Sequence, residues 1–245
     1  MLNNHFSVHH AFARHILAII LLLPFTTNAQ PGRDSVLKVV SSVEEYKKRV
    51  NADSSMRMIE LRSVVRGIVY DLRYATKNNF MNRRMYPAKT NTTFLRKPAA
   101  LALAKIQEEL NARGLGLKIY DAYRPYSVTV KFWELVGDER YVANPARGSG
   151  HNRGIAVDLT IIKLSDGEEL DMGTGFDNFT DTAHHDFKDL PAQVLENRKI
   201  LLSVMEKHGF RRYDTEWWHY FIPGGDKYAV LDLKFKELRN QMHSF

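Results

Sequence analysis

The sequence predicts a single α+β domain with a mainly antiparallel central sheet flanked by helices. Strand-like and helix-like segments both occur, but they do not alternate as regular strand–helix–strand units around a phosphate-binding loop. The chain has 245 residues, of which 44% are apolar, so it is long enough to enclose a real core. No internal repeat and no Gly/Ser-rich linker divides it. One catalytic unit is therefore expected.

Helical periodicity is clearest over residues 97–113. Leucine and isoleucine recur there on one face, Pro98 lies in the first turn, and glycines follow the end of the segment. The same kind of pattern predicts three further helices, over residues 42–50, 126–136 and 191–208.

Strand-like alternation is clearest over residues 155–162. Isoleucine, valine and leucine occupy one face, while the small or polar Ala156, Asp158 and Thr160 occupy the other. That second face leaves room around Asp158. Further strands are predicted over residues 58–74, 117–124 and 217–222, because these segments are rich in β-branched and aromatic residues or alternate between apolar and polar ones.

The first thirty residues differ from the rest of the chain. They contain no Asp, Glu or Lys and a single Arg, Arg14, which precedes the apolar run 16–25. This run is too short to cross a bilayer as a helix, and Ala29 supplies the small residue that signal peptidase needs. We therefore expect a signal peptide over residues 1–29 and an exported protein, periplasmic or secreted. An N-terminal membrane anchor that is never cleaved is the alternative.

Composition limits the chemistry and the partners. The chain has no Cys, which excludes disulfides, a lipidated cysteine and a cysteine nucleophile, so any metal site must use His and carboxylates. The net charge is +7, but Lys and Arg are interleaved with Asp and Glu along the chain without a basic stripe. We expect no nucleic-acid partner, and no stable membrane anchor once the signal peptide is removed. Nothing in the sequence points to a particular oligomeric state.

Three residues are candidate zinc ligands: His151, Asp158 and His219. A catalytic zinc typically keeps three protein ligands and leaves its fourth position for water, which it acidifies. The seven-residue step from His151 to Asp158 cannot lie on one face of a continuous strand, because odd offsets point to opposite faces. We therefore expect a turn at Arg153 and Gly154, with His151 in the loop ahead of the strand. One zinc ion per chain is expected.

Glu216 stands three residues before His219, so the two side chains would diverge on a regular strand. We infer that Glu216 lies at the junction between loop and strand, where it is free to turn toward the zinc site as a general base. Taken singly, such residues have ordinary explanations. A His near aromatic residues is commonly a packed core residue, and a Glu before a strand is commonly solvated.

Two motifs combine these residues. Residues 149–158 match the pattern Ser-x-His-x-x-Gly-x-Ala-x-Asp, and residues 216–219 match Glu-x-x-His. The pair resembles the zinc D-Ala-D-Ala peptidases and Hedgehog-type domains, a group that shares one metal-site fold. Within that group the chain resembles the D-alanyl-D-alanine dipeptidase family of vancomycin-resistance systems and its chromosomal relatives, over roughly Val64 to Phe221. The segments that carry this closer resemblance are 71–76, 79–80, 121–125 and 172–177.

The resemblance implies a zinc-dependent dipeptidase that cleaves D-Ala-D-Ala or a closely related short D-amino-acid dipeptide. It implies zinc at His151, Asp158 and His219, and a general base at Glu216. It also implies that Arg124 stabilises the transition state. That role makes physical sense, because attack of water on an amide builds an oxyanion that a fixed guanidinium can stabilise.

The same resemblance assigns substrate contacts and domain limits. Tyr74 and Asp177 match positions that hold the free ammonium group of the substrate, and Ser149 matches one that binds near its carboxylate. The expected organisation is a signal peptide (1–29), an N-terminal extension (30–63) and a zinc dipeptidase domain (64–245).

Export distinguishes this chain from the vancomycin-resistance enzymes, which act in the cytoplasm, and favours cell-wall recycling or dipeptide scavenging. Two other functions compete. A zinc carboxypeptidase acting on longer peptidoglycan stems would share the metal motifs, but a positioned acid at Asp177 with Tyr74 would exclude longer substrates. A zinc-stabilised binding module, like the Hedgehog signalling domain, would keep the three ligands without needing Glu216 and Arg124.

Overall fold

The computed structural model describes residues 37–242 and 244. The predicted signal peptide, residues 1–29, lies outside the described residues. Within the described part of the chain, no helix combines the length and the apolar character needed to cross a membrane.

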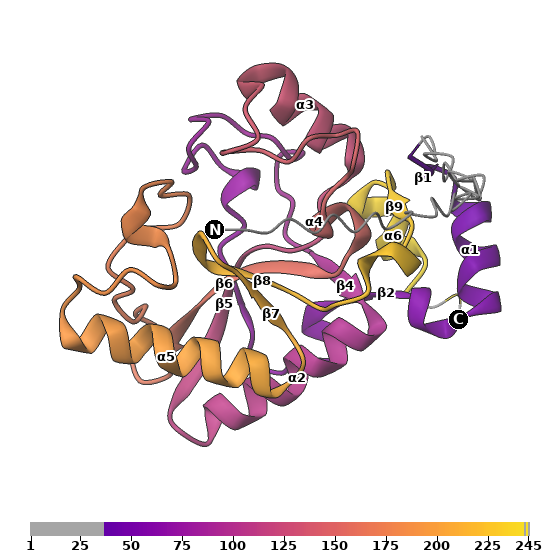
Figure 1. Cartoon of the computed structure of the whole chain (residues 1–245). Helices are drawn as coiled ribbons and strands as arrows, with labels where there is room; N and C mark the ends of the chain where they lie inside the picture. The colour runs from indigo at the N-terminus through magenta and orange to yellow at the C-terminus, as the bar shows by residue number, and fades with distance from the viewer. Residues whose placement is uncertain (1–36, 243, 245) are drawn as a thin grey trace, which may run out of the picture. The chain divides into compact units, whose positions relative to one another are not determined.

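A five-stranded sheet forms the centre of the domain (Figure 1). Only the pair β3 and β5 is parallel, and the other three neighbouring pairs are antiparallel. The predicted α+β class with a mainly antiparallel sheet is therefore confirmed. In spatial order the strands are β3 (Val69–Tyr70), β5 (Leu115–Asp121), β6 (Ala156–Lys163), β8 (Glu216–Phe221) and β7 (Arg211–Tyr213).

The register of the central strands brings charged residues together. Asp158 of β6 pairs with Asp121 of β5 on one side and with His219 of β8 on the other. The rest of β6 is buried on both faces, because its apolar residues pack in the main core while Ala156 and Thr160 are small. Asp121, Asp158 and His219, from three adjacent strands, thus lie side by side in the sheet.

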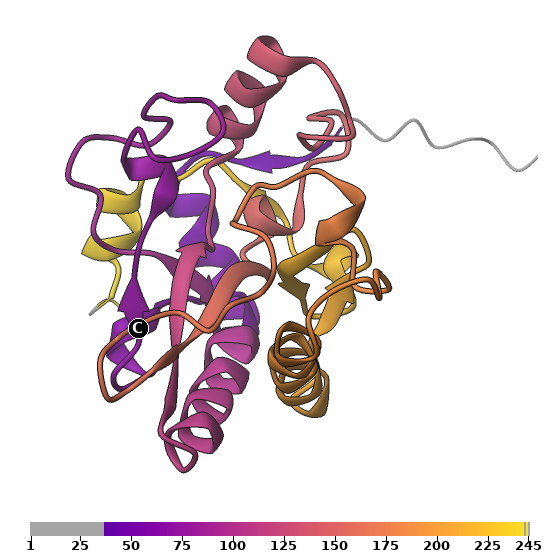
Figure 2. The same ribbon diagram turned by 90° about the vertical axis from the view of Figure 1, so that its left-hand side faces the viewer.

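Helices lie on both sides of this sheet (Figures 1 and 2). Helix α2 (Lys97–Asn111) packs against β5 and helix α5 (Ala192–Lys207) packs against β7, and both bury apolar residues in the main core. Helices α3 (Tyr126–Val136) and α4 (Gly150–Arg153) lie on the opposite side in both views. The site described below lies on this second side.

A second core cluster, separate from the main one, gathers buried side chains from several other elements. Two short pairs belong to it: β1 (Val39–Val40) is parallel to β9 (Val230–Leu231), and β2 (Met58–Glu60) is antiparallel to β4 (Phe94–Arg96). Helix α1 (Val43–Ala52) begins at Ser42, whose side chain accepts a hydrogen bond from the Glu45 amide. The other elements are α6 (Phe235–Asn240) and the 3₁₀ helices Ser54–Met56, Leu61–Ser63, Arg73–Ala75, Asp181–Ala183 and Gly225–Lys227.

The prediction of one strand over residues 58–74 is wrong. Strand β2 ends at Glu60, whose carboxylate accepts the Ser63 amide and caps a 3₁₀ turn. Gly67 then turns the chain at a φ of +82°, a backbone conformation that favours glycine. Only two residues, β3, rejoin a sheet before the next 3₁₀ turn. Val65, Ile68 and Leu72 pack into the core, whereas Val64 and Val69 are exposed, so the segment does not form a continuous strand.

Candidate metal centre and active site

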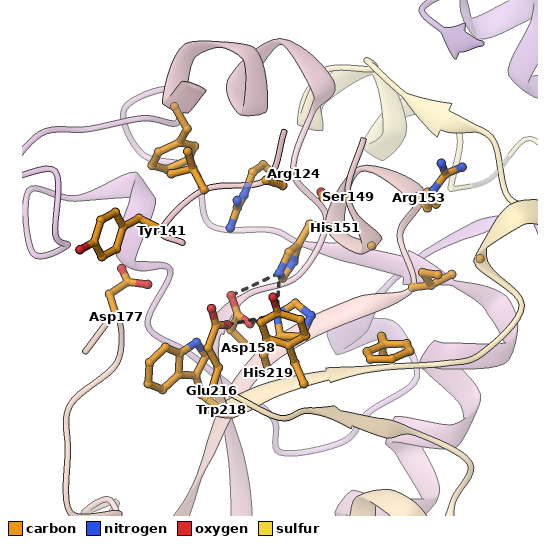
Figure 3. A pocket seen from close by; sticks show the side chains of 18 of the residues that line it. Arg124, Tyr141, Ser149, His151, Arg153, Asp158, Asp177, Glu216, Trp218 and His219 are labelled. Atoms are coloured by element: carbon orange, nitrogen blue, oxygen red, sulfur yellow. Dashed lines mark hydrogen bonds and ion pairs between the residues drawn. The ribbon is translucent and has the colours of Figure 1, made fainter. Parts of the chain in front are cut away.

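His151, Asp158 and His219 come together, and their ligand atoms lie within 4.8 Å of one another (Figure 3). His219 Nδ1 is 2.9 Å from one Asp158 oxygen, and His151 Nε2 is 3.4 Å from the other. The two ring nitrogens are 3.3 Å apart. The pairing of β6 with β8 sets the Asp158–His219 half of this cluster.

His151 reaches the cluster from α4, a one-turn helix, and not from the loop that the sequence analysis expected. Ser149 and Asn152 form a reciprocal capping box that stabilises this short helix. Gly154 ends it in the left-handed conformation, at a φ of +71°, so the chain does turn where a turn was predicted. The helical turn aims His151 at the face of β6 that carries Asp158.

The tautomer of His151 follows from its second contact. Its Nδ1 lies 2.7 Å from the Ala122 carbonyl oxygen, which can only accept, so Nδ1 carries the proton. The lone pair of Nε2 is therefore directed at Asp158 and His219, as in metal sites where a backbone carbonyl orients the ligating imidazole. Two imidazoles and one carboxylate are a donor set that zinc accepts. These residues fit a bound divalent metal ion.

Glu216 lies on the same side of the sheet as His219, with its Oε2 3.7 Å from His219 Nδ1. It is the first residue of β8, where the pairing with β7 shifts register, so the usual alternation does not separate the two side chains. Burial raises the pKa of the Glu216 carboxyl group above its ordinary value, although nearby His219 opposes this. The Glu216 carboxyl group therefore lies beside the three candidate metal ligands but is not one of them.

Arg124 follows the end of β5 and is buried. Its guanidinium donates two hydrogen bonds to one Asp121 oxygen, at 3.0 and 2.8 Å, and lies 5.0 Å from the ring centroids of both Tyr74 and Phe132. The other Asp121 oxygen accepts a hydrogen bond of 2.6 Å from Tyr86. Burial disfavours the charged guanidinium, but the Asp121 carboxylate outweighs this, so the pKa of Arg124 lies above its usual value. Arg124 is a fixed cation.

Asp177 and Tyr74 are joined directly. The Tyr74 hydroxyl is 3.0 and 3.1 Å from the two Asp177 carboxylate oxygens and donates to them. Burial, followed by the charge of Asp158, raises the pKa of the Asp177 carboxyl group well above its ordinary value. Asp177 also has a φ of +60°, which is uncommon outside glycine and is found at strained functional positions. A cationic ligand group would stabilise its ionised form.

All eight site residues predicted from the sequence line one cavity of about 470 Å³. Ser149 is among them, and its side-chain oxygen accepts a hydrogen bond from the Asn152 amide. Asp177 lies at one end of the cavity, Arg124 stands above the metal cluster, and Arg153 lies toward the other end (Figure 3). The predicted residues therefore converge from distant parts of the chain.

Comparison with known proteins assigns the family. A family model described as D-ala-D-ala dipeptidase matches residues 54–238. The chain belongs to the D-Ala-D-Ala dipeptidase family. It is 34% identical over 178 residues to a D-alanyl-D-alanine dipeptidase of Escherichia coli (strain K12), which covers 73% of this chain and 91% of that protein. The resemblance noted from the motifs is confirmed, and the chain is a hydrolase of this dipeptidase family.

A second curated dipeptidase agrees with this assignment. A D-alanyl-D-alanine dipeptidase of Enterococcus faecalis (strain ATCC 700802 / V583) is 34% identical over 178 residues, covering 65% of this chain and 88% of that protein. Among solved structures, the LdcB LD-carboxypeptidase is 20% identical with a TM-score of 0.40, covering 75% of this chain and 77% of that one.

Sequence reasoning did not single out two residues of this dipeptidase site. Asp121 holds Arg124, and Tyr86 holds Asp121. Asp121 had a local signal, since an acid three residues before the important Arg124 lies within the motif 121–125. Tyr86 had none, because it is 35 residues away from Asp121 along the chain.

Proposed function

We propose that this family member is a zinc-dependent dipeptidase that hydrolyses the peptide bond of D-Ala-D-Ala or a closely related short D-amino-acid dipeptide. The observation that carries the proposal is the convergence of a His–Asp–His cluster, a neighbouring acid and a fixed guanidinium on one cavity. Each of these groups meets a separate need of amide hydrolysis. The cavity also offers a buried acid that suits the free amino group of a dipeptide.

His151, Asp158 and His219 would hold the zinc ion, one per chain. When bound, zinc polarises a carbonyl group and lowers the pKa of water, which makes water nucleophilic at neutral pH. Asp158 contributes the negative charge of the ligand set, and the Ala122 carbonyl keeps His151 in the tautomer that ligation requires.

Glu216 acts as general base, because it lines the cavity 3.7 Å from His219 and is not itself one of the three candidate ligands. It accepts a proton from the attacking water and delivers it to the leaving amine. Arg124 stabilises the negative charge that develops on the carbonyl oxygen. Its two hydrogen bonds to Asp121 hold the guanidinium in place before the substrate arrives.

Asp177 and Tyr74 bind the free ammonium group of the dipeptide, and Ser149 binds near its carboxylate. A buried carboxylate that accepts from a tyrosine and has a raised pKa is stabilised in its charged form by an ammonium partner. The same feature disfavours the carboxypeptidase alternative, since a longer peptide has an amide in place of the ammonium. A binding module without catalysis would need neither Glu216 nor Arg124, which both line the cavity.

We further propose that the protein is exported and acts in the periplasm or outside the cell, on the strength of the signal-like segment 1–29. There it would meet dipeptides released from peptidoglycan, so recycling or scavenging is the expected role.

A dipeptide panel in both stereochemistries tests the proposed function. Metal-free and zinc-restored protein are compared on D-Ala-D-Ala, L-Ala-L-Ala and the two mixed diastereomers. We expect hydrolysis of D-Ala-D-Ala only after zinc is restored, with L-Ala-L-Ala cut far more slowly. Equal activity with and without verified zinc, or no activity on any dipeptide, contradicts the proposal.

A further inference from the structure

One side of the active-site cavity is formed by four aromatic rings, Phe80, Phe132, Tyr141 and Phe179, here named the aromatic wall. Phe80 stacks on Phe132 with a centroid distance of 5.8 Å and an angle of 7°. The edge contacts of Phe179 with Phe80 (5.2 Å) and of Tyr141 with Phe179 (5.1 Å) continue the row. Phe132 comes from α3 and the other three from separate loops, so tertiary structure alone assembles the wall.

Only part of the aromatic wall is buried in the protein core. Phe132 is 1% exposed and anchors it, whereas Tyr141 is 39% exposed and Phe80 and Phe179 are half-buried. Aromatic rings that stay accessible inside a concave site mark a surface for an apolar ligand group. The charges at its rim are already paired: Arg140 binds Asp138 at 2.6 Å.

The wall adjoins the proposed ammonium site. Phe179 of the wall follows Asp177 by two residues in the chain, and Asp177 and Tyr141 both line the pocket. Tyr74, which donates to Asp177, packs edge-on against Phe132 at 4.9 Å and Phe80 at 6.5 Å. In the proposed function Asp177 takes the ammonium of the first residue of the dipeptide. The side chain on the adjoining carbon atom is then the substrate group nearest to the wall.

The side chains of D-Ala-D-Ala are single methyl groups, which cannot cover four rings. The cavity of about 470 Å³ also falls within the range of about 300–1,000 Å³ that encloses considerably larger ligands. We propose that this dipeptidase prefers a first residue with a large apolar side chain, of leucine or phenylalanine size, which packs on the aromatic wall. This inference rests on the proposed function and specifies its substrate class.

The expected gain is measurable. One additional methylene group in an apolar pocket changes kcat/KM by roughly 10- to 200-fold, so a leucine or phenylalanine side chain on the wall should give at least about a 10-fold increase over alanine. The gain depends on rings of the wall, so removing one should reduce the preference for large side chains more than it affects D-Ala-D-Ala.

The test uses the zinc-loaded protein and measures kcat/KM for D-Ala-D-Ala, D-Leu-D-Ala and D-Phe-D-Ala, with the L-Leu and L-Phe counterparts as further arms. We expect at least one large-first-residue dipeptide to exceed D-Ala-D-Ala by about 10-fold. Phe179→Ala and Tyr141→Ala should each lower that ratio by about fivefold or more. Leu135→Ala is the matched control, because Leu135 is 43% exposed on α3 and does not line the cavity. It should leave the ratio unchanged.

The outcomes separate this inference from the proposed function. If D-Ala-D-Ala is cut and every larger first residue is cut no faster, the preference is overturned while the dipeptidase function stands. A ratio that neither Phe179→Ala nor Tyr141→Ala changes also overturns it. If the zinc-loaded unmutated protein hydrolyses none of the dipeptides, both the preference and the proposed function are overturned. Zinc content and thermal unfolding identify a variant that does not fold, and Tyr141, the most exposed ring, provides the milder substitution.

Discussion

Arg124 and Asp121 form a buried pair in which both guanidinium hydrogen bonds, of 3.0 and 2.8 Å, end on the same carboxylate oxygen. Asp121 is fully buried, and its second oxygen accepts from the Tyr86 hydroxyl. The arrangement fixes the direction of the guanidinium relative to the metal cluster. Asp121 is therefore a positioning residue, because it acts through Arg124.

Replacement of Asp121 should lower kcat in the same direction as replacement of Arg124, but by less. We expect Arg124→Ala to lower kcat by about 10²- to 10³-fold, as for loss of an oxyanion-stabilising group. Asp121→Asn should lower kcat by about 10- to 100-fold with bound zinc retained, because a misaligned guanidinium stabilises charge less well. The double variant should be little worse than Arg124→Ala alone. Fully multiplicative losses would show that Asp121 acts independently of Arg124.

The matched control for this pair is Asp166→Asn. Asp166 pairs with Lys163 at the same three-residue spacing and a distance of 3.3 Å, but on the exposed surface. Exposed ion pairs are screened by solvent and contribute little, so activity and stability should be nearly unchanged.

Removal of Glu216 should separate catalysis from metal binding. We expect Glu216→Ala to keep its zinc and its fold but to lose turnover by about 10²- to 10⁴-fold, the contribution of a positioned general base. Metal analysis of the purified variant checks this directly. A metal-free Glu216→Ala protein would make Glu216 a ligand and our assignment wrong.

Removal of a ligand should act on zinc content as well as turnover. We expect about one zinc per chain in the purified protein, and Ala substitution of His151, Asp158 or His219 should reduce both, since each would supply a direct bond. Chelators should abolish activity and zinc should restore it. The control is His208→Ala, because His208 binds Glu109 at 2.9 Å and is not in the metal cluster. Full zinc content in all three ligand variants would refute the site.

Stability should fall in mild acid because of His185. Burial, reinforced by Arg212 and Arg198, lowers the pKa of His185 from 6.5 to about 4. Below pH 6.5 the unfolded chain therefore binds a proton that the folded protein does not, so the free energy of unfolding decreases as the pH falls from 6.5 toward 4. Urea titrations across this range check the slope. His185→Phe should flatten it, and an unchanged slope in that variant would exclude His185 as its cause.

Local patterns predicted the elements well where one period dominates. The helix predicted over 126–136 is α3 to the residue, and the alternation of 155–162 gives β6 within one residue at each end. Both segments carry their signal in their own side chains. The segment 58–74 does not, because the capping carboxylate of Glu60 and the φ of Gly67 interrupt a run of β-type residues.

For the site as well, the sequence predicted what local patterns carry and missed what depends on tertiary contacts. Motif spacing was sufficient to nominate residues that the structure brings together, but not their local geometry. A one-turn helix carries His151, and a register shift at the start of β8 turns Glu216 toward His219. The hydrogen bond between Tyr86 and Asp121 joins segments that are distant in sequence. The aromatic wall is likewise assembled from distant segments. No periodicity within one segment can reveal them.

Restriction to dipeptides should depend on Asp177. Its carboxylate accepts from Tyr74, is buried and has a raised pKa, so the ammonium of a dipeptide would supply the missing cation through a charge-assisted hydrogen bond. An N-acylated or longer peptide cannot supply this cation and would leave the buried acid without a charged partner. That costs roughly 1–3 kcal/mol or more, enough for about 100-fold selectivity.

We therefore expect D-Ala-D-Ala to be hydrolysed while N-acetyl-D-Ala-D-Ala and tripeptides are nearly inert. Asp177→Ala should narrow the gap in kcat/KM mainly by weakening the free dipeptide, because the acetylated substrate never used the carboxylate. Tyr74→Phe should narrow it less, since it removes one hydrogen-bond donor to the carboxylate but leaves the charge of Asp177 in place. Comparable kcat/KM for free and acetylated dipeptide in the unmutated protein would favour a carboxypeptidase with an open groove instead.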